Sequence, residues 1–452
     1  MMQTEALENV IEPVSEPKRN ALPLREVRNS AEVSKQTLQV LSLFSGCGGM
    51  DLGFEGGFSV LQQSVNEYLR PDFIDRKLKK GFLQLKRNRF KTIFANDILP
   101  DARNAWTHYF SKRGQEVAPF YKESIVDLVK MHRNGQHVFP DEVDVVTGGF
   151  PCQDFSIAGK RKGFKSSKNH KGEKITDHAA SVETRGQLYM WMKEVIEITQ
   201  PKIFVAENVK GLVNLGDVQS IIQQDFSSAG GNGYIVLPPQ VLHAADFGVP
   251  QSRERVFFIG IKKANLNPVA LQALGMDPIP EAFNPYPSPT HAYTKKGGGL
   301  KDFVQLKDVF KHLQEPEHSS DVSQKYYSKA KFMGKHCQGQ TEIKLAGIAP
   351  TIRSEHHGNI EFRRLSESNG GQNRRELGKG LKERRLTVRE CALIQTFPPD
   401  YEFVIERDQG RKGAFILSPS QAYKVIGNAV PPLLAYNLAR RIESVWDLYF
   451  GE

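Results

Sequence analysis

Nearly continuous apolar runs alternate with amphipathic helical patterns along the first 260 residues, after a polar start. Apolar runs of this length are typical of strands that are buried on both faces. The clearest helical pattern is Gln187–Thr199, where apolar residues recur every three or four positions. The alternation predicts an α/β fold with a mostly parallel sheet. The predicted strands are Leu38–Phe44, Thr92–Ala95, Val143–Thr147, Ile203–Ala206 and Arg255–Gly260.

The pattern changes after Gly260, where Pro, Gly, Lys, His and Ser become frequent and loops predominate. Regular structure returns with a predicted helix at Leu386–Phe397 and a closing helix from Pro431 to about Tyr449. The first 36 residues are polar and lack periodicity, which predicts a mobile tail. The expected organisation is a tail at 1–36, an α/β domain at 37–262 and 382–452, and a smaller irregular domain at 263–381.

Composition adds a basic character and a reducing environment. The 61 Lys and Arg residues exceed the 51 Asp and Glu residues, for a net charge of +10, which suits a polyanionic partner. The four cysteines lie far apart without a CxxC motif, so neither a disulfide framework nor a zinc site is expected. The chain shows no signal peptide pattern and no apolar stretch of about 20 residues. A cytoplasmic protein with no membrane partner and no metal is therefore predicted.

A glycine-rich turn follows the first predicted strand, in LSLFSGCGGMDLGF (41–54). Its glycines would let the backbone turn beneath a ligand, although a plain strand-to-helix turn is the alternative. At the end of the second strand, Asp97 could accept hydrogen bonds from ribose hydroxyls. A basic insert near 69–91 separates the two features, and no phosphate-binding lysine follows the turn. Adenosine without phosphates fits better than NAD or ATP.

A candidate nucleophile lies in TGGFPCQDFSIAGKRKGF (147–164), where a buried strand leads to Pro151 and Cys152. Open α/β sheets place their chemistry at this carboxyl end of the strands. A lone cysteine is more often an inert core residue. Here, however, the flanking residues favour a loop, and seven basic residues between Lys160 and Lys174 would favour the thiolate. The basic loop after Cys152 could close over a substrate.

Five motifs occur in a fixed order: FSGCGG, PCQ followed by FSIAG, ENV, QSRERV and GNAVP. In this series the chain resembles the bacterial DNA (cytosine-5) methyltransferase family. The resemblance spans about 41 to 439. It implies a Rossmann-like domain that uses S-adenosyl-L-methionine, plus a target-recognition domain at 263–381. The implied reaction is methyl transfer to C5 of a cytosine that is flipped out of a specific double-stranded DNA sequence.

The resemblance also implies roles for the site residues. Cys152 would attack C6 of the cytosine, and Glu207 would neutralise charge near N3 and the 4-amino group. Arg255 would fix the glutamate and Arg253 would contact the cytosine carbonyl oxygen, with the division of roles left open. A surface salt bridge and structural arginines are the alternatives for these three residues. A water molecule would remove the C5 proton.

A second set of residues would hold the donor, and the chain end, near Asn428 and Val430, would pack beside the glycine turn. One departure concerns Ser124, which stands where the family often has Asp, so Glu123 or Asp127 would replace it. Arg389 and Glu390 are expected to be structural. The implied donor-binding residues are Phe44, Gly46, Gly48, Gly49, Asp97, Ile98, Pro151, Leu188, Asn428 and Val430.

Three other functions fit the sequence less well. Transfer RNA methylation would not need a large middle domain, and a nicotinamide-dependent dehydrogenase would not explain PCQ and ENV. A DNA-binding protein on an inactive scaffold conflicts with the complete set of catalytic residues. The segment 349–364 carries side chains that read base edges or phosphates. The inserts near 69–91 and 165–184 are either phosphate contacts or surface excursions. The expected protein is a monomer that serves a restriction-modification system together with a cognate restriction endonuclease.

Overall fold

The structure is a computed structural model, and it describes residues 36–114, 118–151, 188–214, 217–293, 299–334, 336–354, 359–407 and 414–451. Residues 37–452 form one compact unit. The predicted tail lies outside the described residues except for Gln36. The predicted domain limits at 262 and 381 stay a prediction.

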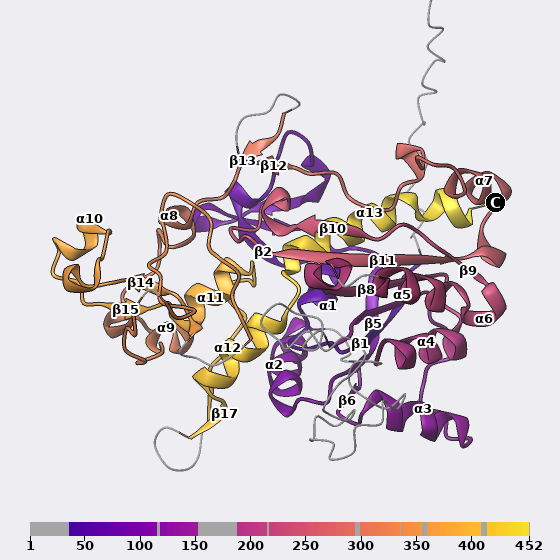
Figure 1. Ribbon diagram of the computed structural model, residues 1–452, viewed down its shortest axis with the longest axis horizontal. Helices are drawn as coiled ribbons and strands as arrows, with labels where there is room; N and C mark the ends of the chain where they lie inside the picture. The colour runs from indigo at the N-terminus through magenta and orange to yellow at the C-terminus, as the bar shows by residue number, and fades with distance from the viewer. Residues whose placement is uncertain are drawn as a thin grey trace, which may run out of the picture. The chain divides into compact units, whose positions relative to one another are not determined.

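The central sheet has eight strands, and seven of them run in the order β10-β11-β8-β7-β1-β5-β6, with β9 paired to β11 (Figure 1). The five strands from β8 to β6 are parallel, which confirms the predicted mostly parallel sheet. Strand β11 is antiparallel to its three neighbours. The chain moves outward from β1 in both directions, so β1 and β7 flank the point where the strand order reverses. The strands are β1 (Leu38–Leu43), β5 (Phe90–Asn96), β6 (Phe120–Tyr121), β7 (Val145–Gly149), β8 (Ile203–Val209), β9 (Tyr234–Val236), β10 (Gln240–His243) and β11 (Glu254–Lys262).

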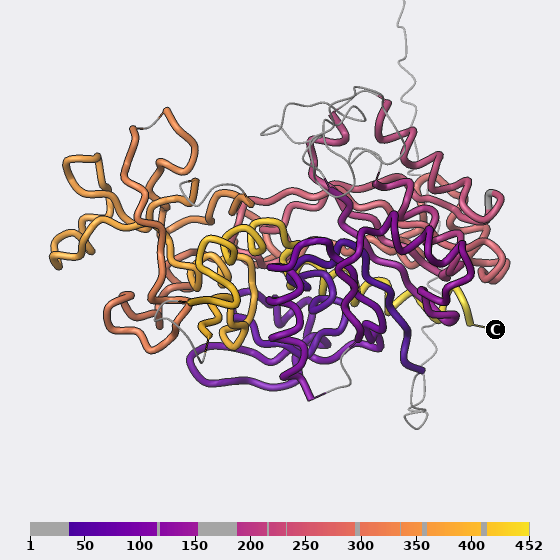
Figure 2. Tube along the Cα trace, turned by 90° about the horizontal axis from the view of Figure 1, so that it is seen from below, coloured from indigo at the N-terminus to yellow at the C-terminus, as the bar shows by residue number. Residues whose placement is uncertain are grey.

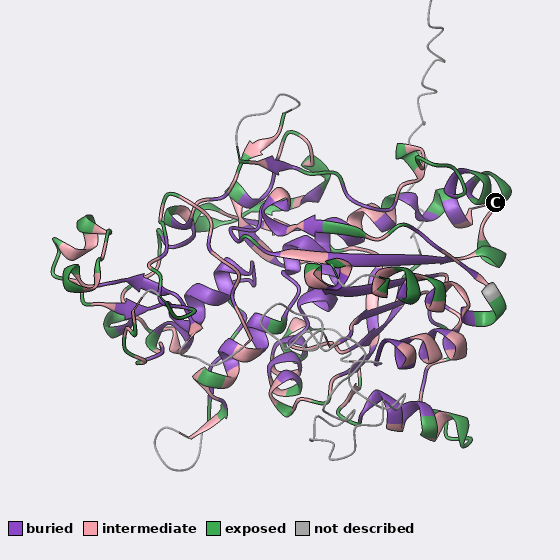
Figure 3. Ribbon diagram, viewed as in Figure 1, coloured by how far each residue is buried: buried purple, intermediate pink, exposed green. Residues whose placement is uncertain are grey.

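Two apolar layers cover the sheet because successive side chains of a strand point to opposite faces. In β8, Val205 joins the layer of α1, α2 and α13, whereas Phe204 joins the layer of α3, α4 and α5. The central strands are buried along most of their length, as Figure 3 shows. This explains why their sequences read as continuous apolar runs. The helices are α1 (Gly49–Glu55), α2 (Pro100–Phe110), α3 (Ile125–Arg133), α4 (Leu188–Thr199), α5 (Val218–Ser227), α6 (Ala229–Asn232) and α13 (Pro432–Phe450).

The basic insert near 69–91 contributes β3 and β4 to a second, antiparallel sheet with the order β2-β4-β3. Its side chains Phe73, Leu83 and Leu85 are buried in the larger apolar layer, and Phe73 packs edge-on against Tyr436 of α13. The insert is therefore anchored to the core and is not a loose surface excursion. The strands of this small sheet are β2 (Ser59–Leu61), β3 (Ile74–Lys77) and β4 (Phe82–Leu85).

The stretch 263–381 contains short elements, as its loop-rich sequence predicts. Regular structure returns at α11, and the closing helix α13 confirms its predicted limits within one residue. The remaining elements are α7 (Pro268–Leu274), α8 (Leu306–Val309), α9 (Val322–Lys325), α10 (Arg374–Leu377), α11 (Val388–Ile394), α12 (Pro419–Asn428), β12 (His291–Ala292), β13 (Lys301–Asp302), β14 (Phe362–Arg364), β15 (Arg384–Arg385), β16 (Ile405–Glu406) and β17 (Phe415–Leu417).

Candidate active site

The glycine turn follows β1 at the carboxyl edge of the sheet. The φ angles of Phe44, Gly46 and Gly48 are all positive (52°, 56° and 77°). This conformation favours glycine, which stands at two of the three positions. The backbone N–H of Ser45 donates to the carbonyl of Asn96 at 2.8 Å, which ties the turn to β5. A Cβ atom added at Gly46 would meet no described atom within 4 Å. The described residues therefore leave clear the position that a side chain at Gly46 would take.

The two following glycines are required by close packing instead. A Cβ atom at Gly49 would lie 2.2 Å from the carbonyl oxygen of Val430. A Cβ atom at Gly48 would lie 2.6 to 2.7 Å from ring atoms of Phe110 and Trp106. The predicted return of the chain end to the glycine turn is therefore confirmed at Gly49.

Asp97 lies at the end of β5 and faces the glycine turn. Its Oδ2 accepts from the N–H of Gly46 and its Oδ1 from the N–H of Leu99, both at 2.9 Å. Burial raises the pKa of the Asp97 carboxyl to about 6. Each carboxylate oxygen keeps a second acceptor position. The neighbouring Ile98 is 38% exposed. An open glycine cradle beside a carboxylate fits the adenosine part of S-adenosylmethionine.

A buried carboxyl that the sequence prediction did not include lies under this turn. Asp51, in the first turn of α1, accepts from Ser42 Oγ at 2.5 Å and from Trp106 Nε1 at 2.6 Å. Burial raises its pKa to about 7. The Trp106 ring stacks on Phe110 at 4.3 Å, directly below Gly48. Asp51 therefore positions Trp106, which packs against Gly48 of the glycine turn. The sequence signal for this role is an acidic residue within an otherwise apolar helix.

Glu207, near the end of β8, is 8% exposed and is the register partner of Gly149 on β7. A Cβ atom at Gly149 would lie 2.9 Å from Glu207 Oε2, so the second glycine of TGG leaves room for the carboxylate. The adjacent Asn208 donates through Nδ2 to the carbonyl of Phe150 at 3.2 Å. The ENV motif thus holds the chain just before Pro151 and presents the glutamate beside it.

Arg255, near the start of β11, pairs with this glutamate: Arg255 Nε lies 2.8 Å from Glu207 Oε1. Burial is the largest influence on Glu207 and raises its pKa, while the charges of Arg255 and Arg253 oppose this effect. The group can therefore hold a proton more readily than an exposed glutamate. A buried carboxyl with one side covered by a guanidinium can donate or accept a proton at its other oxygen.

Arg253 takes a different position from its neighbour in the motif. It is 1% exposed, and its Nη atoms donate to the carbonyls of Ile352, Gly427 and Ala429 at 2.8 to 3.0 Å. The adjacent Gln251 is fully buried, and its Oε1 accepts from the N–H of Ile352 at 3.0 Å. These contacts join the QSRER segment to the chain on both sides of Asn428. Gln251 was missed by the sequence prediction, although it belongs to the same motif.

The remaining predicted residues differ in whether the structure describes them and in how far they are exposed. Pro151 is the last described residue before Cys152, and Cys152 and the insert near 165–184 lie outside the described residues. Leu188 is buried at the start of α4, Val430 is buried, and Asn428 is exposed. Ser124, which stands where the family often has Asp, caps α3 by accepting from the N–H of Val126. Its two predicted replacements differ, because Glu123 is exposed and Asp127 is half-buried. Glu390 pairs with buried Arg384, and Arg389 pairs with the partly exposed Asp321.

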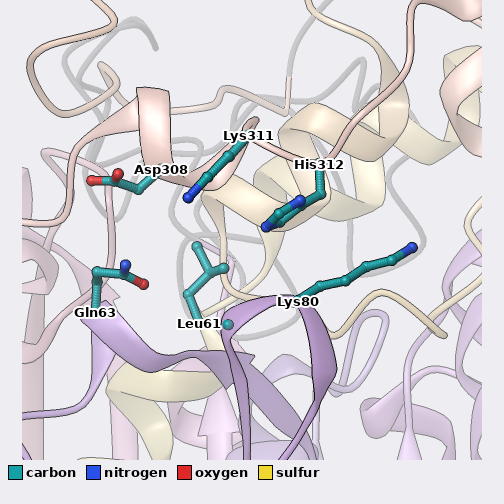
Figure 4. A pocket seen from close by; sticks show the side chains of 7 residues that line it. Leu61, Gln63, Lys80, Asp308, Lys311 and His312 are labelled. Carbon is teal, nitrogen blue, oxygen red and sulfur yellow. The ribbon is translucent and has the colours of Figure 1, made fainter.

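A cavity of about 290 Å³ lies away from these residues, between the small sheet and α8 (Figure 4). Its lining includes Lys80, Asp308, Lys311 and His312 but none of the predicted site residues. Among the described residues, no cluster of three His, Cys, Asp or Glu side chains could hold a metal ion. None of the helices in the described part of the chain has the length and apolar character needed to cross a membrane.

Comparison with known proteins identifies a family and a fold. The model of the family "C-5 cytosine-specific DNA methylase" matches residues 77–444. Type II methyltransferase M.BsuRI of Bacillus subtilis is 32% identical over 437 residues, which cover 94% of this chain and 84% of that protein. Type II methyltransferase M.BspRI of Lysinibacillus sphaericus is 31% identical over 416 residues, 89% and 81% of the two chains. Among solved structures, DNMT2 of Spodoptera frugiperda shares the fold, with a TM-score of 0.51, 16% identity, and coverage of 90% of this chain and 99% of that one.

Proposed function

The chain belongs to the C-5 cytosine-specific DNA methylase family. We propose that it methylates C5 of a cytosine flipped out of double-stranded DNA, with Cys152, Glu207 and Arg255 as catalytic residues. The observation that carries this proposal is the buried pair of Glu207 and Arg255 beside Gly149, at the edge of the sheet from which the chain continues to Cys152. Flipping costs a few kcal/mol of stacking and pairing, which contacts with the opened strand offset.

The donor of this family is S-adenosylmethionine, which supplies an electrophilic methyl group when it is bound. Asp97 would bind the ribose hydroxyls, and the open face of the glycine turn would receive the nucleoside. Asn428 and Val430 would cover the methionine part. The tight packing of Val430 on Gly49 supports this arrangement, because it brings the GNAVP segment directly onto the turn.

In the proposed reaction, the Cys152 thiolate forms a bond to C6 of the cytosine, and Glu207 gives a proton to N3. The ring thereby gains electron density at C5, the atom that is methylated. The raised pKa of Glu207 suits this step because the acid must be protonated when the thiolate adds. Arg255 holds the other oxygen of the carboxyl and fixes its direction.

The covalent bond to C6 must then be broken. In the proposal, a water molecule removes the proton from C5, the electron pair returns to the ring, and the sulfur leaves as a thiolate while Glu207 recovers its proton from N3. The contact between Arg253 and the cytosine carbonyl oxygen stays a prediction. Its three backbone carbonyl partners favour a positioning role for Arg253 between the catalytic residues and the donor site.

The test is methyl transfer from labelled donor to duplex DNA. Cys152→Ala should abolish transfer, and Glu207→Gln should lower the rate about 10²- to 10⁴-fold. In the presence of the methyl donor, DNA containing 5-fluorocytosine should form a denaturation-resistant adduct with the natural protein, because after methyl transfer the fluorine on C5 cannot leave as a proton does. The Cys152→Ala variant should form no adduct. Transfer that persists in Cys152→Ala, or that occurs only on transfer RNA, would overturn the proposal.

We further propose that the protein acts as a monomer in the bacterial cytoplasm, on the nucleoid, and protects DNA from a cognate restriction endonuclease. The similarity to Type II methyltransferases supports this role. Bisulfite sequencing of DNA from expressing cells should reveal one methylated sequence. The endonuclease encoded beside the gene should fail to cut that DNA.

A further inference from the structure

The cavity between the small sheet and α8 contains none of the residues of the proposed reaction. It forms where two parts of the chain that are far apart in the sequence meet. In Figure 2, most residues of the stretch 300–380, in salmon and orange, extend to the left of the α/β part. One wall of the cavity comes from the start of this stretch and the other from the small sheet. Figure 4 shows Asp308, Lys311 and His312 on one side and Gln63, Leu61 and Lys80 on the other.

The cavity is rich in positive charge and in hydrogen-bond donors. Lys80 and Lys311 are both exposed, and the turn KLKKG (77–81), which carries Lys80, has no acidic residue. His312 and Gln63 add an imidazole and a side-chain amide. Among the described lining residues, the one carboxylate is that of Asp308. The lining therefore favours an anion.

Neither of the two lysines is neutralised by a described protein group. Within the described residues, Lys80 and Lys311 form no ion pair, and Asp308 forms none either, although it lines the same cavity. By contrast, Lys77 of the same turn lies 3.4 Å from a carboxylate oxygen of Glu67. The positive charges at the cavity are thus left for a ligand.

The wall that belongs to the small sheet is fixed by two basic side chains from a distant segment. Nε2 of buried His291 lies 3.0 Å from the carbonyl oxygen of Gln63. Lys301 Nζ donates to the carbonyl of Val65 at 2.7 Å. These contacts hold the backbone that presents Gln63 to the cavity.

The opposite wall is fixed at the start of α8. Leu306 is buried, and its N–H donates to the carbonyl of Gly347 at 2.9 Å. The N–H of Lys307 donates to the carbonyl of Leu345 at 2.8 Å. Because each wall is anchored by its own contacts, a ligand that enters the cavity has little backbone to order, and ordering costs oppose binding.

Phosphate is the anion that suits these side chains best. Lysine binds phosphate as a compact point charge. A phosphate monoester carries a charge of about −1.5 to −2 near pH 7 and three acceptor oxygens. This charge matches two lysines, and the oxygens match an imidazole and an amide. The volume of about 290 Å³ also leaves room for a group attached to the phosphate, beside Leu61.

Going beyond the proposed function, we propose that this cavity is a second binding site, for a phosphate group that Lys80 and Lys311 hold. The phosphate belongs either to a small phosphorylated compound or to the backbone of DNA, since both present the same oxygens. Gln63 and His312 donate hydrogen bonds to it, and the charge of Asp308 weakens its binding. The basic insert thereby has a role outside the methyl transfer.

Acylation of lysines, located by mass spectrometry, measures occupancy of the cavity in the full-length protein. With inorganic phosphate at about ten times its dissociation constant, acylation of Lys80 and Lys311 should slow about 10-fold. Exposed Lys325 and Lys379, which do not line the cavity, should react at an unchanged rate. Potassium chloride at equal ionic strength is the salt control, because screening alone would affect all four lysines.

Two substitutions should change the phosphate affinity in opposite directions, which damage to the fold would not do. Lys311→Met keeps the length of the side chain and removes its charge. The phosphate concentration that half-protects Lys80 should therefore rise about 10- to 150-fold. Asp308→Asn removes a repelling carboxylate, so this concentration should fall about 2- to 5-fold. Lys325→Met is the matched control and should leave it unchanged.

Duplex DNA in a buffer without phosphate distinguishes the two sources. Protection of Lys80 and Lys311 by inorganic phosphate but not by the duplex would assign the site to a small phosphorylated compound. Protection by the duplex would assign it to the DNA backbone. In that case Lys311→Met should reduce the slope of log affinity against log salt by about 1.

Unchanged acylation of Lys80 and Lys311 with both inorganic phosphate and duplex DNA would overturn the proposal. Tighter phosphate binding in Lys311→Met than in the natural protein would overturn it as well. The phosphate measurement needs neither donor nor methyl transfer. Its failure is therefore distinguishable from failure of the proposed function, in which the natural protein would methylate no DNA.

Discussion

In the central sheet, neighbouring residues of one strand face two apolar layers, whereas the region around β14 and β15 is filled by arginine and glutamate side chains. Arg364 and Arg384 both bind Glu315, and Arg384 also binds Glu390 at 2.8 Å. Arg363 and Arg364 bind Glu376 as well. The arginines of this region are buried, like the apolar side chains of the sheet, but their partners Glu315 and Glu376 are partly exposed.

The two interiors should lose stability for different reasons when a side chain is removed. An apolar interior loses stability in proportion to the atoms removed and to the cavity that is left. A buried ion pair contributes little by itself, but removal of one partner leaves an uncompensated charge. The stability of the ionic region should therefore depend on each single charge and on pH. The stability of the sheet should depend on the volume of its side chains.

The largest effect on stability is expected for Glu390→Ala. Glu390 is 1% exposed, pairs with Arg384 through both oxygens, and accepts the N–H of Thr387 in a capping box. Its loss should lower the free energy of unfolding by about 3 to 5 kcal/mol. Urea denaturation measures this, with exposed Glu317→Ala as the control. A loss below about 1 kcal/mol would show that the network behaves like a surface pair.

Gly149→Ala should affect catalysis more than stability. Its Cβ would lie 2.9 Å from Glu207 Oε2 and would displace the carboxylate. A displacement of about 1 Å at a reacting group can lower the rate about 10²-fold. Steady-state methylation kinetics provide the measurement. The control Gly347→Ala adds a Cβ at 3.6 Å from its nearest neighbour, an ordinary contact, and should retain full activity.

Lowering the pH should change the stability of the two regions in opposite directions. The arginines hold the pKa of Glu315 at about 2, below its unfolded value, so its contribution is present above about pH 4.5 and is lost as the pH falls toward 2. Asp51 behaves oppositely: burial raises its pKa to about 7, so its contribution is lost as the pH rises from about 4 toward 7. Each effect should be on the order of 3 to 4 kcal/mol.

Hydrogen exchange followed by mass spectrometry measures this contrast. Peptides around β14 and β15 should open first below pH 4, while peptides of β1 and α1 stay protected. Asp51→Asn should remove the stability change between pH 4 and 7. Simultaneous opening of both regions in acid would contradict the separation.

The smallest effect is expected for Ile259→Val in β11, a fully buried side chain of the larger apolar layer. Removal of one methylene group should lower the unfolding free energy by about 0.5 to 1.5 kcal/mol. The loss should be the same at low and high salt, unlike that of Glu390→Ala. A salt-dependent loss would mean that charges reach into the sheet interior.

The accuracy of the sequence predictions follows the same division. Strands β1, β5, β7, β8 and β11 and helix α4 were predicted within a few residues, because burial on both faces leaves a continuous apolar run in the sequence. The small sheet in the basic insert was not predicted. Its lysines and arginines hide the alternation of Leu83 and Leu85 with polar residues, and its pairing with β2 is not local.

The catalytic set shows a related limit. Glu207 and Arg255 were predicted to interact, and the structure brings them to 2.8 Å. The contacts of Arg253 were not predicted, because its carbonyl acceptors lie 99 to 176 residues away along the chain. Backbone carbonyls carry no sequence signal, so no motif could indicate them. The buried roles of Asp51 and Gln251 were missed for a similar reason.

By itself, the sequence determined the family, the α/β class, the order of the motifs and the residue types needed for the chemistry, since these depend on local patterns. Only the tertiary structure decided which glycines face open space and which face packed backbone, and that Arg253 holds carbonyls of distant segments. It also decided that Glu207 is buried beside Gly149. These properties depend on neighbours brought together by folding, where burial sets the protonation of a carboxyl and the partners available to each charge.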